Sequence, residues 1–376
     1  MDGFPINAKA AIFSTLTALV DRGGAGLKAF VPQLLMTFIK ALTDSSRAVR
    51  GRASAALGRL MPLTTRVDPL LMALCAACVH AEGSAICAFA LDAVAVVLIK
   101  GGDKATKAAF DKVRAAACGA LLTSTVDAHP AAAACLSALG QLSNIDAAAV
   151  TDIVFDLCDG AKGGTEASMC GALLGTAAII QTAGQRSTDA RDDAFDLLSR
   201  GVNDAQRPAV QAAACAALGT IFTVPPPILG GDASEEAEKT RKGECRATVQ
   251  AVLSAFSSSL SQAAANGAAE DTRLAGLTAI KSLAKNYPVL AQQHIARFLP
   301  SLASALRDIH IRHKYVAERA LRHLLLTSDE GSGSGLVENA AAIGALAGAD
   351  APFVRDYVRR IVMKQAADSD DEGDKW

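Results

Sequence analysis

A helical pattern that recurs along the chain most constrains what this sequence can fold into. In residues 38–63, apolar side chains recur at intervals of three and four residues and form one narrow stripe, which is typical of an amphipathic helix. The stripe consists of Val49, Ala53, Ala56, Leu57 and Leu60. Residues 29–42 form a second amphipathic run, in which Pro32 suits a first helical turn because its missing N–H costs nothing there. Residues 30–60 are thus predicted to form a helix, a tight turn and a second helix.

The same pattern returns later in the chain. Ala-Leu-x-Asp, followed after eight residues by Ala-x-x-Ala-Leu-x-x-Leu, occurs around Asp44 and again, without a gap, around Asp308. A third copy around Asp204 slips by one residue. Ala-Leu-Gly segments end at Gly58, Gly140 and Gly219, which are 82 and 79 residues apart. If each interval contains two repeat units, one unit has roughly 40 residues, which is the length of HEAT or armadillo helix pairs. A single pair cannot bury its own stripe, so we predict an all-α, HEAT/armadillo-like α-solenoid of about eight helix pairs.

Shifts in composition predict the domain organisation. We assign residues 1–327 to the solenoid. Within it, residues 223–246 contain consecutive prolines, two glycines and then mixed charge, which indicates a charged loop. We expect a flexible linker at 328–335, terminal helices at 336–366 and a disordered acidic tail at 367–376.

Charge and composition exclude several classes of function. The net charge is -1, with 37 basic and 38 acidic residues, so no global field favours DNA or a membrane surface. Aromatic residues make up only 4%, which argues against a large aromatic ligand pocket. The nine scattered cysteines suggest reduced, buried thiols in the cytoplasm. The N-terminus does not resemble a signal peptide, and the best apolar run, 85–100, is interrupted by Asp92 and too short to span a bilayer.

Catalytic and metal-binding motifs are weak throughout. Cys75 and Cys78 form a C-x-x-C pair in apolar helical sequence, which favours core packing over redox or zinc chemistry. His310, His313 and His323 could suggest a metal, but flanking basic residues oppose a bound cation, so a solvated basic face is expected. We predict no enzymatic activity and no cofactor or metal.

Four arginines in the opening helix are the candidate partner-binding residues: Arg47, Arg50, Arg52 and Arg59. For Arg50 a structural interpretation competes, because a turn aspartate such as Asp44 and an early arginine often bond to the neighbouring repeat. Arg52 and Arg59 lie on the other flank, and with Arg47 they could form a basic strip that pairs with carboxylates on a partner. A solvated face remains an alternative for each of them.

Residues 30–74 carry a more specific signature, "PQLLMTFIKALTDSSRAVRGRASAALG" followed by "VDPL". This segment resembles the C-terminal part of the very large HEAT-repeat translational activator of general amino-acid control, a family also described as a stalled-ribosome sensor. Residues 271–284 and 298–326 fit the late repeats of that family.

The resemblance implies a non-catalytic, cytoplasmic protein. In this family the C-terminal region binds the RWD domain of the kinase that phosphorylates initiation factor two alpha, and it promotes activation of that kinase in amino-acid starvation. Arg47, Arg50 and Arg52 stand in the signature, and a basic residue of this region is implied in kinase binding. Of these, Arg50 and Arg52 are the residues that we expect to contact the kinase. The ribosome is contacted mainly by upstream repeats that are missing here, so we expect a fragment or a shortened relative.

Two other scaffold interpretations stay open. One is a generic HEAT adaptor, such as a transport receptor or a phosphatase subunit. The other is a scaffold that binds the ribosome or RNA through the basic helix at 307–322, where phosphate contacts would make binding strongly salt-dependent. Its basic residues are Arg307, Arg312, Lys314, Arg319 and Arg322.

Overall fold

A computed structural model describes residues 5–79, 84–123, 126–225, 234–265, 268–326, 344–346 and 351–360. The described residues up to 326 form sixteen α-helices and five short 3-10 helices, residues 351–360 are also helical, and no strand element occurs among the described residues. The predicted all-α fold built from helix pairs is therefore confirmed.

The chain divides into two compact units. The first comprises residues 1–197 and 225–244, and the second comprises residues 198–224 and 245–376. Two of the three divisions along the chain fall inside α10 and α12, so each of these helices contributes residues to both units; the third, between residues 224 and 225, lies after α11.

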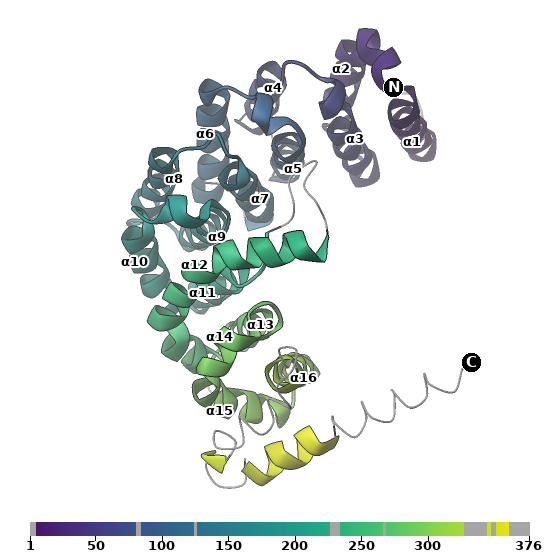
Figure 1. The fold of residues 1–376 in the computed structure, drawn as a ribbon. Helices are drawn as coiled ribbons and strands as arrows, with labels where there is room; N and C mark the ends of the chain where they lie inside the picture. Colours follow the sequence, from purple (N-terminus) through teal and green to yellow (C-terminus); the bar gives the residue numbers. More distant parts are fainter. Residues whose placement is uncertain are drawn as a thin grey trace, which may run out of the picture. The chain divides into compact units, whose positions relative to one another are not determined.

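The first unit is built from stacked helix pairs (Figure 1). Its helices are α1 (Ile6–Gly23), α2 (Val31–Ala41), α3 (Arg47–Leu60), α4 (Asp68–Val79), α5 (Ser84–Gly101), α6 (Lys107–Thr123), α7 (His129–Gln141), α8 (Ala147–Gly160), α9 (Glu166–Ala183) and the starts of α10 (Arg191–Val202) and α12 (Glu235–Ala263). The 3-10 helices are η1 (Gly24–Phe30), η2 (Met61–Leu63), η3 (Gly102–Lys104), η4 (Val126–Ala128) and η5 (Gly184–Ser187). Helices α1, α3, α5, α7 and α9 form one row in which each packs on the next, and α2, α4, α6 and α8 cover one side of that row.

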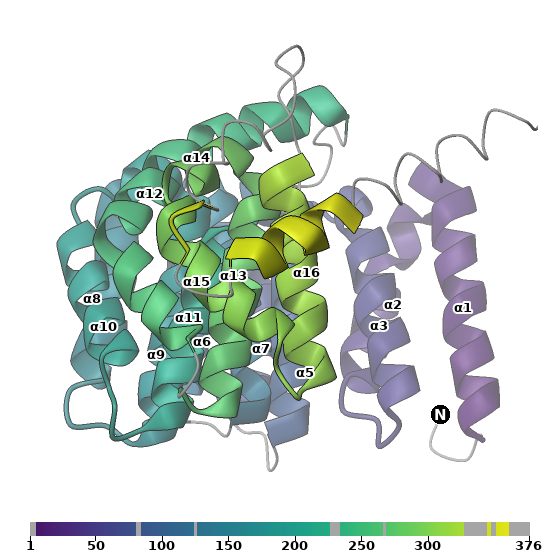
Figure 2. The ribbon, with the colours of Figure 1, turned by 90° about the horizontal axis from the view of Figure 1, so that it is seen from below.

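The second unit repeats this arrangement. Its helices are α11 (Pro208–Ile221), the later part of α12 (Glu235–Ala263), α13 (Glu270–Asn286), α14 (Pro288–Gln293), α15 (Ile295–Leu306) and α16 (Ile311–Leu326). Helices α11, α13 and α16 lie in a row, α14 packs on α13, and α15 packs on α16 (Figure 2). Serines of α12 bond to α15: Ser261 Oγ donates to the Arg297 carbonyl at 2.6 Å.

Small residues let neighbouring helices approach one another closely. Gly171 in α9 faces α6, and a Cβ placed on it would overlap the carbonyl oxygen of Leu121. The alanine-rich composition has the same effect at many positions, because short side chains leave the backbones as the packing surfaces.

The nine cysteines are reduced thiols outside any disulfide, and all but Cys78 are buried. Burial raises the pKa of Cys75 to about 11 and the pKa values of Cys118 and Cys215 to about 12. Such thiols stay protonated and behave as small apolar side chains.

Two helical segments of the first unit are both long and apolar. Residues 85–104, which include α5, and residues 166–187, which include α9, are long and apolar enough to cross a bilayer by length and composition. The expectation that the first of them is too short was wrong, because the helical run continues past Lys100 through a 3-10 turn. Most residues of both segments are buried within the first unit, and buried core helices meet the same criteria.

The predicted loop at 223–246 is partly wrong. Its second half, from Glu235 onward, is the start of α12, and Glu235, Glu236 and Glu238 lie in the first turn. Negative side chains stabilise a helix N-terminus, which explains why this charged stretch is helical. Residues 226–233, the predicted linker at 328–335 and the predicted acidic tail at 367–376 lie outside the described residues. Of the predicted terminal helices at 336–366, residues 351–360 are described and are helical.

Candidate functional site

Helix α3 carries the four candidate arginines and lies between α1 and α5 in the row of the first unit. Its buried face contains the whole predicted apolar stripe: Val49, Ala53, Ala56, Leu57 and Leu60. This stripe fixes the rotation of the helix about its axis, and that rotation decides where each arginine lies.

Arg50 lies inside the repeat. It is only 9% exposed, and its Nη1 donates to the backbone carbonyls of Asp44 at 2.7 Å and Ser45 at 2.9 Å. Its guanidinium lies 4.3 Å from the ring centroid of Phe89 in α5. Arg50 therefore ties the turn to α3 and contacts the next helix of the row.

Asp44 bonds to the preceding repeat, as the structural interpretation of this turn anticipates. Its partner there is a lysine of α1. Its Oδ2 accepts from Lys9 Nζ of α1 at 2.7 Å, and its Oδ1 accepts from the backbone N–H of Ser46 at 2.9 Å. The bond from Lys9, followed by that from Ser46, lowers the pKa of Asp44. Arg50 bonds to the carbonyl of Asp44 and not to its carboxylate.

Arg52 and Arg59 lie along the α1 side of α3. Arg52 Nη1 donates to the Ala10 carbonyl at 2.7 Å and to Ser14 Oγ at 2.8 Å. Arg59 Nη1 lies 3.7 Å from Asp21 Oδ1, and both of these side chains are well exposed. Arg52 is partly committed to α1, whereas Arg59 forms only a solvent-exposed ion pair that a partner carboxylate can replace.

Arg47 lies at the opposite edge, on the α5 side. It is exposed, and its positive charge acts on the carboxyl of Asp92 in α5. Burial raises the pKa of Asp92, and the positive charge of Arg47 offsets part of that effect.

Small residues occupy the exposed surface between these arginines. Ala48, Gly51 and Ala55 are all exposed, and a Cβ on Gly51 would meet nothing within 4 Å. A partner backbone can therefore approach α3 closely while its carboxylates pair with the arginines at either edge. Sequence reasoning missed these small residues, although their i, i+3 and i+7 spacing was a usable signal. We call this surface the α3 face; it consists of Arg47, Ala48, Gly51, Arg52, Ala55 and Arg59.

The C-x-x-C pair lies in α4 and shows no feature of a metal centre. Cys75 is buried and Cys78 is partly exposed. Across the described residues, no group of three or more His, Cys, Asp or Glu side chains is placed to hold a metal ion.

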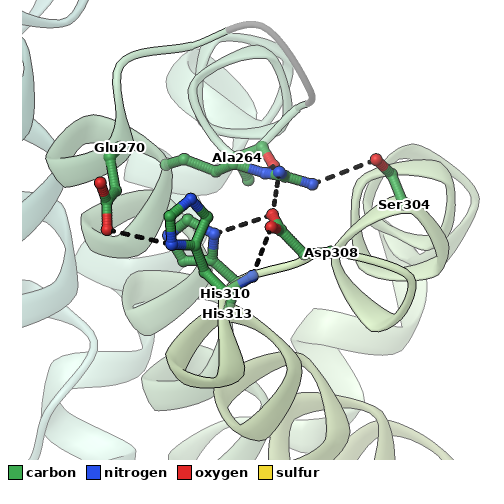
Figure 3. Close-up of polar contacts among 7 residues, drawn as sticks. Ala264, Glu270, Ser304, Asp308, His310 and His313 are labelled. Atoms are coloured by element: carbon green, nitrogen blue, oxygen red, sulfur yellow. Dashed lines mark hydrogen bonds and ion pairs between the residues drawn. The ribbon is translucent and has the colours of Figure 1, made fainter.

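The histidines near residue 310 belong to a polar network in the second unit (Figure 3). His313 is only 2% exposed, and its Nδ1 lies 2.8 Å from Asp308 Oδ2, which also forms an ion pair with Arg273 of α13. His310 is exposed, with its Nδ1 3.5 Å from Glu270 Oε1. The expectation of a solvated basic face is therefore wrong for His313, because Asp308 draws this ring into the turn.

The network around Asp308 repeats the arrangement around Asp44. In both, the turn aspartate binds a cation one repeat back: Lys9 is 35 residues before Asp44, and Arg273 is 35 residues before Asp308. Burial by itself would raise the pKa of Asp308, but the backbone N–H of His310, the His313 ring and the Arg273 charge lower it to about 2.

Comparisons with known proteins agree with this architecture. A family described as HEAT-like repeat matches residues 7–60. The chain is 53% identical over 70 residues to Protein ILITYHIA of Arabidopsis thaliana and 51% identical over 69 residues to the human stalled ribosome sensor GCN1. It is 36% identical over 102 residues to the eIF-2-alpha kinase activator GCN1 of Saccharomyces cerevisiae.

These matches cover only part of each protein. They span 19%, 18% and 27% of this chain but only 3%, 3% and 4% of the respective relatives, so the chain matches a small part of their length. Among solved structures, yeast importin-beta (Kap95p) has a TM-score of 0.59 at 15% identity, over 91% of this chain and 41% of that one. Kap121p bound to Pho4p has a TM-score of 0.58 at 13% identity, over 85% of this chain and 32% of that one. At such identities the likeness shows the fold alone, which is an α-solenoid of HEAT-like repeats.

Proposed function

We propose that this chain is a non-catalytic HEAT-repeat scaffold of translational control. In this proposal it binds the RWD domain of the kinase that phosphorylates initiation factor two alpha, and it promotes activation of that kinase in amino-acid starvation. The observation that carries the proposal is the local identity, 51% to a protein named as a stalled ribosome sensor and 36–47% to proteins named as eIF-2-alpha kinase activators. The protein would act in the cytoplasm, and association with ribosomes would depend mainly on other parts of a longer assembly.

The α3 face is the proposed contact with the kinase. It offers cations on both edges of a strip of small side chains, a geometry suited to a partner that presents carboxylates close to its backbone. Arg47 and Arg59 are the proposed contacts, because both are exposed and, among the residues that the structure describes, neither bonds to the backbone of another helix. Arg50 is proposed to act only indirectly, by holding the turn and α3 in place.

A pull-down with the purified RWD domain of the starvation kinase tests the proposal. The wild-type chain is compared with an Arg47→Glu/Arg59→Glu variant and with Arg66→Glu, a matched control that reverses one exposed arginine outside α3. Circular dichroism and thermal unfolding confirm that each protein is folded. We expect the double variant to lose binding and the control to retain it.

The other outcomes are equally informative. If the double variant binds like the wild type, the RWD domain does not use the α3 face. If the folded wild type does not bind at all, kinase binding by this chain is refuted, and a generic HEAT adaptor becomes the better description.

A further inference from the structure

A second exposed surface lies in the other unit, at the turn before α16 and along its first turns. Ile309 is 86% exposed, Ile311 is 82% exposed and Tyr315 is 52% exposed. Single exposed apolar side chains are common on protein surfaces, but three large ones within seven residues form a patch of the kind that marks interaction sites.

Comparison with α3 shows that repeat packing does not require these side chains. The two helices align without a gap from their turn aspartates, and their buried positions match, as in Ala53 with Ala317 and Leu57 with Leu321. At the outward positions the residues differ completely. Where α3 has Arg47, Ala48, Gly51 and Ala55, α16 has Ile311, Arg312, Tyr315 and Arg319. Because α3 folds with alanine and glycine at these positions, the bulky residues of α16 serve something other than its packing.

The charged groups around this patch are mainly positive. Arg312 and Lys314 are exposed, and within the part of the chain that the structure describes their side chains have no hydrogen-bond or ion-pair partner. The guanidinium of Arg319 lies 4.9 Å from the ring centroid of Tyr315, which holds both side chains in one arrangement. On the same side, His323 has a lowered pKa, caused first by burial and then by the charges of Lys285, Arg319 and Lys281.

The acidic groups nearby are already engaged. Asp308 is buried between Arg273 and His313. Glu318 Oε1 lies 3.3 Å from Arg322 Nη2, and Glu270 faces His310. The exposed cations therefore remain available to an external anion.

We propose that this surface docks an acidic segment of a protein partner that carries an apolar side chain among its carboxylates. The α16 face, as we call it, consists of Ile309, Ile311, Arg312, Lys314, Tyr315 and Arg319. The isoleucines and the tyrosine bury the partner's apolar side chain, and the three cations pair with the flanking carboxylates.

The apolar part of the face favours a protein over a nucleic acid. Its two most exposed side chains are aliphatic, and an aliphatic side chain provides no aromatic platform on which a base could stack. A phosphate backbone would also gain nothing from displacing water from two isoleucines, whereas an aliphatic or aromatic side chain would.

Selection from a displayed library of random peptides tests the docking proposal for a partner of unknown sequence. The wild-type chain is the target, and an Ile311→Ser/Arg312→Glu variant is used for counter-selection. We expect the enriched peptides to combine aspartate or glutamate with a large apolar residue. A synthetic peptide of the enriched sequence is then titrated by fluorescence anisotropy. The Ile311→Ser and Arg312→Glu variants should each weaken its binding by about tenfold or more.

Phe155→Ser is the matched control, because Phe155 is a large apolar side chain, 58% exposed, on α8 of the first unit. It should leave peptide binding unchanged. Enrichment of no face-dependent peptide, or of peptides without acidic residues, overturns the proposal. The proposal is also overturned if a single-stranded RNA oligonucleotide binds the wild-type chain more tightly than the peptide does and the same variants lose this RNA binding.

The result is independent of the proposed kinase contact. The α16 variants are also tested in the RWD pull-down, where we expect them to bind like the wild type. Loss of RWD binding in these variants would show that the α16 face belongs to the kinase site and is not a second surface.

Discussion

At the scale of single residues, the junction between neighbouring repeats depends on which cation binds the turn aspartate. Lys9 binds Asp44 in the first unit, and Arg273 binds Asp308 in the second. The second junction is more deeply buried: the side chains of Arg273 and Asp308 are 7% and 5% exposed, against 12% and 13% for Lys9 and Asp44. A buried ion pair is costly to break, because the remaining charge has no replacement for water.

Asp308→Asn should therefore destabilise the second unit by roughly 3 kcal/mol at neutral pH. The folded-state pKa of Asp308 is lowered from 3.8 to about 2, so its carboxylate contributes stability above pH 3.8 and loses that contribution as the pH falls from 3.8 through 2. Urea unfolding of wild type and variant measures both effects. The stability gap should narrow over that acidic range, and a gap that is constant with pH would show that the charge of Asp308 is not its cause.

Arg50→Ala and Arg47→Ala provide a second test at this scale. Loss of Arg50 leaves two backbone carbonyls without their donor and exposes Phe89, so we expect a destabilisation of about 2 kcal/mol. Arg47 is exposed, and its replacement should cost less than about 0.5 kcal/mol. Equal costs in chemical unfolding would contradict the buried position of Arg50.

The sequence could predict part of this site. The apolar stripe of α3 and the bond of Asp44 to a neighbouring repeat follow from spacing alone. The identity of the partner, Lys9, does not, because it depends on how α1 stacks against the turn. The contrast between Arg50 and Arg52 does not follow from spacing either. Both arginines lie at the edges of the stripe, and Arg50 is buried because Phe89 of α5 lies against it.

At the scale of the helix, the distance to the backbone of the neighbouring helix limits how large a side chain a position can carry. Gly51 and Gly171 both lie within helices of the first unit, but Gly51 faces open space whereas Gly171 faces the backbone of α6. The sequence does not distinguish these two glycines, because both lie in alanine-rich helical segments.

Gly171→Ala should destabilise the protein by about 2 kcal/mol, since the added methyl group must push α9 away from α6. Gly51→Ala should instead stabilise it by about 0.5–1 kcal/mol, since it restricts the unfolded chain without meeting any neighbour. Thermal unfolding of the pair compares them directly. If both changes stabilise the protein, helix propensity, and not the contact between α6 and α9, dominates at Gly171.

At the scale of the whole molecule, stability in a stacked array is local. Each repeat contacts mainly its neighbours, so a defect spreads through adjacent repeats and not uniformly through the chain. The recurring pattern in the sequence predicts stacked pairs, and the structure confirms them. The sequence pattern does not reveal the two compact units, because that division depends on how the helices pack in space. The pattern also gives a wrong prediction for the start of α12, because the charged residues there favour a loop as much as a helix N-terminus.

Hydrogen exchange should show this locality. Gly171→Ala should lower amide protection in α6, α7 and α9 and leave protection in α13 and α16 unchanged. Asp308→Asn should lower amide protection in α13 and α16 and leave protection in α6, α7 and α9 unchanged. Protection lost throughout both units by either variant would indicate a single cooperative unfolding unit.

The buried thiols have a practical consequence for following such local opening. Eight native cysteines are shielded from solvent, and they lie in helices of both units, from Cys75 in α4 to Cys245 in α12. Each can react with an alkylating reagent only while its own surroundings are open, because alkylation requires an exposed thiolate. Pulses of alkylation followed by peptide mass analysis would therefore time the opening of individual repeats in the unmodified protein, with no engineered probe.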